Sequence, residues 1–322
     1  MRSAHLPIAT LCLGAYIVAA QAPQSGPAPR PYAAATHPWP VINLNVLALD
    51  KQKLPLTETD PGAFQVLDDG VPQSILSLSG SATPVSLAVV VDLSGSTCPF
   101  QIKPNAACSS YDPALHSLVD LLASLPAGSE VMLVTFADKH YLNLKFAPVS
   151  EFKLQLFDTL RAQGGSAIYD ALVATDYYFA KNARFKRRAI ILLIDGEDNA
   201  SHLNLEQAIS RMSYASCPML YAINTANEHR DTMSGSERRH SARALEILSE
   251  ACGGIVVDAY GKKGSPEGAQ AVAAAIRNQF ALQYSSTNPA KDGKVHKLKI
   301  TPPPNAGKVE LHFVSEYPAP IP

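Results

Sequence analysis

The sequence predicts an α/β protein with a doubly wound, mostly parallel sheet that carries one antiparallel edge strand. A small antiparallel β domain, built from the amino- and carboxyl-terminal flanks, is expected beside it. Two observations lead to this prediction. Near-continuous apolar stretches alternate with helical patterns, as in parallel sheets buried on both faces; they span residues 85–91, 131–136, 189–194, 218–223 and 254–258. Before and after this region, apolar and polar residues alternate, which predicts half-exposed antiparallel strands.

Length and composition allow one domain of ordinary size and a smaller one. The chain has 322 residues, of which 47% are hydrophobic and 17% are charged, so a substantial core is expected. The formal net charge of −1 gives no electrostatic basis for binding nucleic acid or an acidic membrane surface. We therefore predict no nucleic-acid partner, and the sequence leaves the oligomeric state open.

The first 22 residues resemble a signal peptide. Arg2 is followed by an uncharged apolar stretch, 6–20, and then by small residues suited to cleavage near position 22. The apolar stretch is short for a membrane span, which favours a cleaved signal peptide. The alternative is an uncleaved anchor, which is the only membrane attachment that we expect. We predict export to the periplasm, the cell surface or the medium. Residues 23–40 are rich in proline and alanine and predict an extended linker.

The remaining elements follow in chain order. Residues 41–82 are expected to form the first part of the small β domain, with a turn at Asp69-Gly70. Residues 83–285 are assigned to the α/β domain, with helices expected at 113–125, 151–162, 168–181, 204–212, 237–251 and 267–281. The segment 141–146 follows its preceding strand too closely for a parallel crossover, which predicts an antiparallel edge strand. Residues 286–322 complete the β domain, with strands at 295–301 and 308–314 that pair with the amino-terminal flank.

Four cysteines remain after residue 22. In an exported protein such cysteines favour disulfide bonds. Cys98 and Cys108 bracket a short excursion and are paired on that ground, which leaves Cys217 and Cys252 to pair with each other. Free buried thiols are the alternative, and a cytoplasmic location would favour them.

Two of the predicted parallel strands end in a carboxylate. Asp92 ends the first one and is followed at alternate positions by Ser94 and Ser96, and Asp195 ends another. Ligands of such sheets collect beyond the carboxyl ends of the strands, where the strand order reverses. If the two strands are neighbours there, Asp92 and Asp195 face the same crevice.

A glycine pair places a further hydroxyl near this crevice. Gly164-Gly165 precedes Ser166 at the start of a predicted helix and leaves its side chain projecting. Three hydroxyls and two carboxylates form an oxygen shell that suits Mg²⁺ first, with Mn²⁺ or Ca²⁺ as alternatives. Neutral hydroxyl ligands leave the ion electron-poor, so it attracts a carboxylate from a partner. Asp198 and Asn199 are assigned either to support of this site or to the amino-terminal cap of the helix at 204–212.

Three motifs carry a family resemblance. The stretches DLSGS, GGSAIYDAL and LLIDGEDN resemble the metal-ion-dependent adhesion site of von Willebrand factor type A domains. The resemblance implies a site formed by Asp92, Ser94, Ser96, Ser166 and Asp195, with the hydroxyls on the ion and the aspartates often acting through water. Ser166 stands where the family usually has threonine. The flanks are similar to those of exported von Willebrand factor A-related proteins common in Acidobacteria, so the resemblance extends over about residues 41–314.

These features predict a protein that binds and does not catalyse. The expected function is metal-ion-dependent adhesion, in which a bound cation coordinates an exposed aspartate or glutamate of a protein partner. A metal-independent structural or assembly module of the cell envelope is the alternative. An enzyme would need a general base and a nucleophile, and no such motif is present. The histidines show no paired ligand spacing, which argues against zinc. The basic stretch 181–188 is assigned a structural role at the opposite end of the sheet.

Overall fold

The computed structural model describes most of the chain from residue 41 onward. The described residues are 41–56, 64–95, 113–195, 197–212, 217–225, 235–259, 267–287, 294–302 and 307–318. The predicted signal peptide, the linker, Ser96, Cys98 and Cys108 lie outside these residues. None of the helices found in the described residues is long and apolar enough to cross a membrane.

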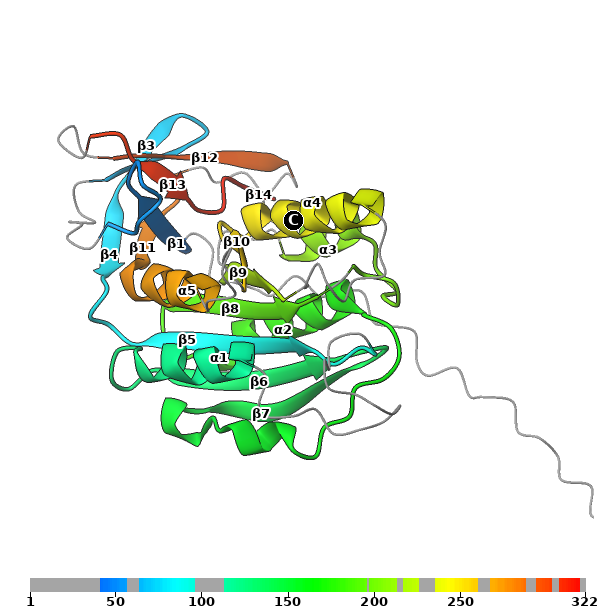
Figure 1. Cartoon of the computed structure of the whole chain (residues 1–322). Coiled ribbons are helices and arrows are strands. Elements are labelled where there is room, and N and C mark those ends of the chain that lie inside the picture. The colour runs from blue at the N-terminus through cyan, green and yellow to red at the C-terminus, as the bar shows by residue number, and fades with distance from the viewer. Residues whose placement is uncertain are drawn as a thin grey trace, which may run out of the picture. The chain divides into compact units, whose positions relative to one another are not determined.

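A six-stranded sheet forms the centre of the α/β part (Figure 1). Its strands lie in the order β10-β9-β8-β5-β6-β7. Five of them are parallel: β5 (Val85–Asp92), β6 (Glu130–Phe136), β8 (Arg187–Ile194), β9 (Met219–Asn224) and β10 (Ile255–Asp258). The edge strand β7 (His140–Pro148) runs antiparallel to β6, as the short connection predicted. This confirms the expected mostly parallel sheet.

Helices cover both faces of this sheet, which explains its nearly unbroken apolar strands. Helices α1 (Pro113–Ala123) and α5 (Glu267–Asn278) pack on one face, against Val89 and the other strand residues that point to that face. Helices α2 (Ile168–Asn182), α3 (Leu205–Met212) and α4 (Gly235–Ala251) pack on the other face, against Val90 and the other strand residues that point to it. Successive strand residues point to opposite faces, so both sets must be apolar.

The helix expected at 151–162 is not formed. Two short 3₁₀ turns, η2 (Val149–Glu151) and η3 (Leu154–Phe157), take its place. The backbone between them is extended at Phe152, and the rings of Phe152 and Phe157 contact each other in the core with centroids 6.2 Å apart. Residues five apart lie about 140° apart around an α-helix. A continuous helix would therefore expose one of the two rings.

The flanks pair with each other in two antiparallel four-stranded sheets. The first has the order β13-β1-β11-β4 and consists of β13 (Glu310–His312), β1 (Val41–Leu49), β11 (Phe280–Ser285) and β4 (Ile75–Ser79). The second has the order β14-β12-β2-β3 and consists of β14 (Glu316–Pro318), β12 (Val295–Thr301), β2 (Gln65–Asp68) and β3 (Val71–Gln73). Pairing of β1 with β13 and of β2 with β12 joins the two flanks, as predicted.

Strands β1 and β11 depart from the expectation. The sequence predicts half-exposed strands within residues 41–82, yet every residue of β1 after Val41 is buried. Its Asn43 side chain donates to the Lys186 carbonyl at 3.0 Å, so β1 is attached to the segment that leads into β8. The helix expected to continue to 281 ends at Asn278. Strand β11 then enters the flanking sheet, although its residues fall in the range assigned to the α/β domain.

A disulfide joins Cys217 to Cys252, with Cα atoms 5.6 Å apart. Cys217 lies just before β9, and Cys252 follows α4 directly. The bond ties the end of the helix to the start of the strand and agrees with the predicted pair. The other predicted pair, Cys98–Cys108, lies outside the described residues.

Asp176, in the buried part of α2, gives a prediction about pH. Burial raises the pKa of its carboxyl group from 3.8 to about 7, against the opposing effect of Arg188. The folded chain thus keeps this proton up to about pH 7, while the unfolded chain releases it near pH 4. The free energy of unfolding must fall as the pH rises between these values. The pKa difference corresponds to about 4 kcal/mol.

We therefore expect Asp176→Asn to gain stability relative to wild type as the pH rises from 4 to 8, by up to about 4 kcal/mol. Urea unfolding of both proteins across this pH range measures the difference. Asp120 is exposed in α1, so Asp120→Asn is the control and should show no such trend. A constant difference between Asp176→Asn and wild type at every pH would contradict the prediction.

Candidate metal centre

The two strand-ending carboxylates lie on neighbouring strands. Asp92 is the last residue of β5, and Asp195 directly follows β8. Strands β5 and β8 are paired in parallel, and the chain continues from β5 to β6 on one side and returns to β8 on the other. The order reverses at this point, where ligands of such sheets bind. The two strands are thus neighbours, which is the condition that the sequence analysis set for Asp92 and Asp195 to face one crevice.

Both carboxylate oxygens of Asp92 accept hydrogen bonds inside the protein. The backbone N–H of Ser94 donates to Oδ1 at 2.7 Å, and the Ser166 hydroxyl donates to Oδ2 at 2.9 Å. Asp92, Ser94 and Ser166 are each no more than 3% exposed. The structure therefore brings together three of the five predicted site residues in direct contact. Ser96 lies outside the described residues.

Electrostatics link Asp195 to this group. Burial, above all, raises the pKa of Asp92 from 3.8 to about 7, and the negative charge of Asp195 adds to the increase. Hydrogen bonds from Ser94 and Ser166 act in the opposite direction. Asp195 is only partly buried, but its carboxylate still repels the buried carboxylate of Asp92, and a cation between the two removes that repulsion. The donor set of carboxylate and hydroxyl oxygens suits a hard cation such as Mg²⁺.

The loop that presents Ser166 is fixed by contacts from three neighbouring segments. The Gln163 N–H donates to the Leu93 carbonyl at 2.9 Å, and the Gly165 N–H donates to Asp138 Oδ1 at 2.7 Å. Gly164 has a φ of +78°, which favours glycine. A Cβ atom at Gly165 would collide with Asn199 Oδ1. Gly164 is thus needed for its backbone conformation and Gly165 for the close approach of Asn199.

Asp198 and Asn199 support this loop and do not cap the helix at 204–212. Asn199 Oδ1 accepts the Ser166 N–H at 2.7 Å, and Asp198 Oδ2 accepts the Tyr169 N–H at 3.1 Å. Asp198 therefore caps α2, whose own first residues offer no side-chain cap. The cap of α3 is Asn204, whose Oδ1 accepts the Gln207 N–H at 2.8 Å. The sequence alone favours a capping role on the next helix, because α2 begins beside this loop only in the folded chain.

Asp138 is a site-supporting residue that the sequence analysis missed. It follows β6 at the same edge of the sheet as Asp92 and Asp195. The signal was available, since Asp138 is also an acidic residue just after an apolar strand. Its side chain is exposed and holds the glycine loop in place.

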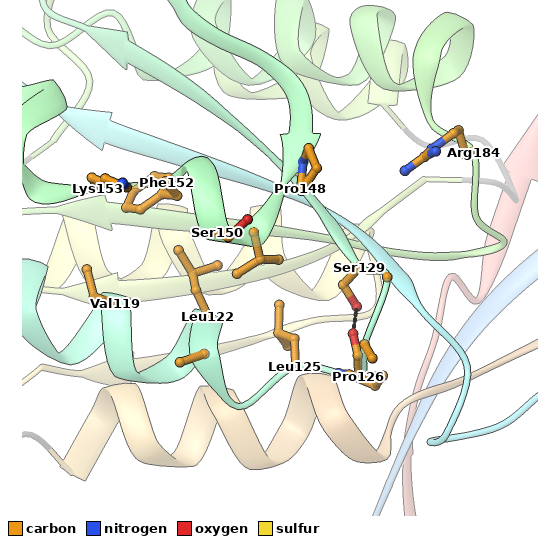
Figure 2. A pocket seen from close by; sticks show the side chains of 14 residues that line it. Val119, Leu122, Leu125, Pro126, Ser129, Pro148, Ser150, Phe152, Lys153 and Arg184 are labelled. Carbon is orange, nitrogen blue, oxygen red and sulfur yellow. Dashed lines mark hydrogen bonds between the residues drawn. The ribbon is translucent and has the colours of Figure 1, made fainter.

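A groove of about 660 Å³ lies elsewhere, between α1, η2 and the segments that lead into β6 and β8 (Figure 2). Its apolar lining includes Val119, Leu122 and Phe152, and Figure 2 shows Lys153 and Arg184 at its two ends. Residues Pro126–Ser129 precede β6, so the groove lies at the amino edge of the parallel strands. It is therefore separate from the site of Asp92, which lies at the carboxyl edge.

No protein-family model matches the chain, and no curated protein matches it. Among solved structures it is similar to the protein BatB of Bacteroides thetaiotaomicron, with 14% identity over 60% of this chain and 97% of that one and a TM-score of 0.41. A von Willebrand factor type A protein from Catenulispora acidiphila has 11% identity over 83% and 76%, with a TM-score of 0.43. The SpRpn10 VWA domain has 12% identity over 59% and 94%, with a TM-score of 0.38. The similar structures thus include von Willebrand factor type A domains, the family that the three sequence motifs resemble.

Proposed function

We propose that this chain is an exported, non-enzymatic binding protein that presents a divalent cation to an aspartate or glutamate of a protein partner. The observation that carries the proposal is the contact of Asp92 with Ser94 and Ser166 at the carboxyl edge of β5, beside Asp195. Mg²⁺ is the first candidate, with Mn²⁺ and Ca²⁺ next. The proposed ligand set is Asp92, Ser94, Ser96, Ser166 and Asp195.

The chemistry of these residues supports recognition. Neutral hydroxyls leave a bound divalent ion with much of its charge, so a carboxylate from outside is attracted to it. Among the described residues near the site, Glu197 and Asp198 are the candidates for a general base. Asp198 already accepts hydrogen bonds from Tyr169 and Ser201, which suits a structural role. Recognition needs no bond to break and is consistent with every contact given above.

A metal-independent structural or assembly module is the second candidate. One observation favours it: Ser94 and Ser166 already satisfy both oxygens of Asp92 without a cation. A pKa near 7 also allows Asp92 to be neutral below that pH. Under this alternative, millimolar cation leaves the protein unchanged.

The proposal of export is supported by the amino-terminal segment and by the disulfide between Cys217 and Cys252. Disulfides persist in oxidising compartments outside the cytoplasm. Periplasm, cell surface and medium are all consistent with this proposal.

The function is tested by coupling a carboxylate probe to cation binding. The full chain is titrated with Mn²⁺, and the free ion is followed by electron paramagnetic resonance. The titration is repeated with an end-blocked peptide that has one glutamate, and again with the same peptide bearing glutamine. We expect the glutamate peptide to tighten Mn²⁺ binding by at least about fivefold, because binding of the two ligands is reciprocally coupled.

The glutamine peptide is the matched control and should leave the Mn²⁺ affinity unchanged. Equal effects of the two peptides would contradict recognition of a carboxylate. Absence of Mn²⁺ binding at millimolar concentration would overturn the proposal and favour the structural module.

A further inference from the structure

A second group of acidic and imidazole side chains lies in a flanking sheet, whereas Asp92 belongs to the central sheet. Asp68 ends β2, Asp69 begins the turn to β3, and His296 lies in the adjacent strand β12. One ligand atom from each residue lies within 4.8 Å of the others. The β2–β12 pairing holds these side chains together across a separation of more than 200 residues.

Asp68 is a fully buried carboxylate with unequal oxygens. Its Oδ2 accepts hydrogen bonds from the hydroxyls of Tyr284 at 3.1 Å, Ser286 at 3.0 Å and Tyr317 at 2.7 Å. Its Oδ1 is buried and has no hydrogen-bond donor among the described residues. This oxygen lies 3.5 Å from Nδ1 of His296. A buried carboxylate oxygen without a donor is costly, and either a donor or a cation would remove that cost.

Asp69 is oriented toward the same nitrogen. Its Oδ1 accepts the Lys297 N–H at 2.9 Å, and its own N–H donates to the Lys297 carbonyl at 2.9 Å. These contacts fix the carboxylate so that Oδ2 lies 3.3 Å from His296 Nδ1. In both aspartates one oxygen is thus held by donors while the other faces the imidazole. The Asp69 side chain is 42% exposed, so the group is open to solvent on that side.

We propose that Asp68, Asp69 and His296 bind a divalent cation of the zinc type, through Asp68 Oδ1, Asp69 Oδ2 and His296 Nδ1. Bonds of about 2.0–2.1 Å in a tetrahedral shell place neighbouring ligand atoms about 3.3–3.4 Å apart. The separations of 3.5 and 3.3 Å in the structure match this spacing. One nitrogen and two oxygens suit Zn²⁺, whereas Mg²⁺ and Ca²⁺ prefer oxygen alone. Solvent takes the fourth position from the exposed side of Asp69.

The site joins the two flanks of the chain. Two ligands belong to the amino-terminal flank and the third to the carboxyl-terminal flank. The unfolded chain does not hold them together, so cation binding stabilises the paired sheets. The role is structural and independent of the proposed partner recognition at Asp92. The sequence analysis argued against zinc because it looked for paired histidines within one motif. The ligands proposed here come from distant strands, so they leave no such motif.

The test uses the full chain with Asp92→Ala, so that the first metal centre does not contribute. After dialysis against chelator, the protein is loaded with Zn²⁺, freed of excess metal and measured for zinc by elemental mass spectrometry. We expect one equivalent of zinc per chain and a rise of the unfolding midpoint by about 5 °C or more at saturating Zn²⁺. Co²⁺ in its place should give the visible absorption of a tetrahedral site.

Asp69→Asn and His296→Asn, each in the same background, should lose the zinc equivalent, the rise in midpoint and the cobalt absorption. Asp69→Asn keeps an oxygen for Lys297, so it is expected to fold without metal. The control is Asp50→Asn, which alters another partly exposed turn carboxylate that accepts backbone N–H groups. Zinc binding that is absent in the Asp92→Ala chain, or unchanged by Asp69→Asn, would overturn the proposal. His296 would then serve only as a neighbour of the two aspartates in the packing of β2 against β12.

Discussion

Replacing Asp92 with alanine is expected to abolish the stabilisation that Mg²⁺ gives to the wild-type chain. A cation that binds only the folded state at a concentration 100 times its Kd raises the free energy of unfolding by about 2.7 kcal/mol. For a folded body of this size, with an unfolding entropy of about 2.1 cal/mol/K per residue, that corresponds to a midpoint rise of about 4–5 °C. Asp92 is central to the proposed site, because Ser94 and Ser166 are both oriented by its carboxylate.

The variant is expected to fold. It loses two hydrogen bonds worth about 1 kcal/mol each, but it also loses a buried charge whose pKa is raised by burial and by Asp195. Thermal unfolding with chelator, Mg²⁺ and Mn²⁺ in turn measures the effect. Asp258→Ala is the control, because Asp258 ends β10 at the same edge of the sheet without belonging to the site. A midpoint rise of equal size in Asp92→Ala and wild type would exclude Asp92 from the cation site.

Most of the central sheet was predictable from the sequence because its physical cause is local. A strand buried on both faces needs apolar residues at every position, and residues 85–91 have that pattern. The pairing of β5 with β8 was a condition and not a prediction, because Asp92 and Asp195 end two such strands in the same way but the sequence does not show which strands are neighbours. Where the determinant was a residue pattern along the chain, the prediction holds.

The errors arise where distant segments decide the local structure. Phe152 and Phe157 have helix-compatible neighbours, but the core requires both rings and interrupts the helix. Strand β1 alternates in sequence, yet its polar Asn43 and Asn45 are buried because they bond to the backbone beside and within β8. The residue pattern around Asn43 and Asn45 does not predict these partners, because the partners are distant in the sequence.

The candidate metal centre shows the same division. Ser166 was found from its glycine loop, whereas the roles of Asn199 and Asp198 depend on how α2 begins beside that loop. The second group, at Asp68, Asp69 and His296, was beyond the sequence altogether. Its members come from the two ends of the chain and meet only through the pairing of β2 and β12.

Replacing Arg187 with methionine is expected to destabilise the fold by about 3–5 kcal/mol, because four backbone carbonyls lose their donor. Arg187 is fully buried at the start of β8, and its guanidinium donates to four backbone carbonyls. Two of them, Ser81 at 3.0 Å and Thr83, belong to the connection from β4 to β5. The other two, Ile276 at 2.5 Å and Arg277 at 2.8 Å, lie in the last turn of α5, before β11.

The position of these carbonyls explains the size of the effect. The chain passes between the flanking sheets and the α/β part at both segments, and one side chain holds both of them. Burial lowers the pKa of Arg187 to about 10, so the guanidinium keeps its charge at neutral pH. Methionine fills a similar volume but donates no hydrogen bond, so it removes a donor from all four carbonyls at once.

Urea unfolding of Arg187→Met, Arg187→Lys and wild type measures the contribution of the guanidinium. Lysine retains the charge but lacks the planar fork of five donors, so it should restore only part of the lost stability. Arg211→Met removes an exposed arginine from α3 and is expected to change stability by less than about 0.5 kcal/mol. Hydrogen exchange should rise first in α5 and in the connection before β5, because these segments lose their shared donor. A loss below about 1 kcal/mol would show that the two crossings are held together by other contacts, chief among them the packing of β1 against α5.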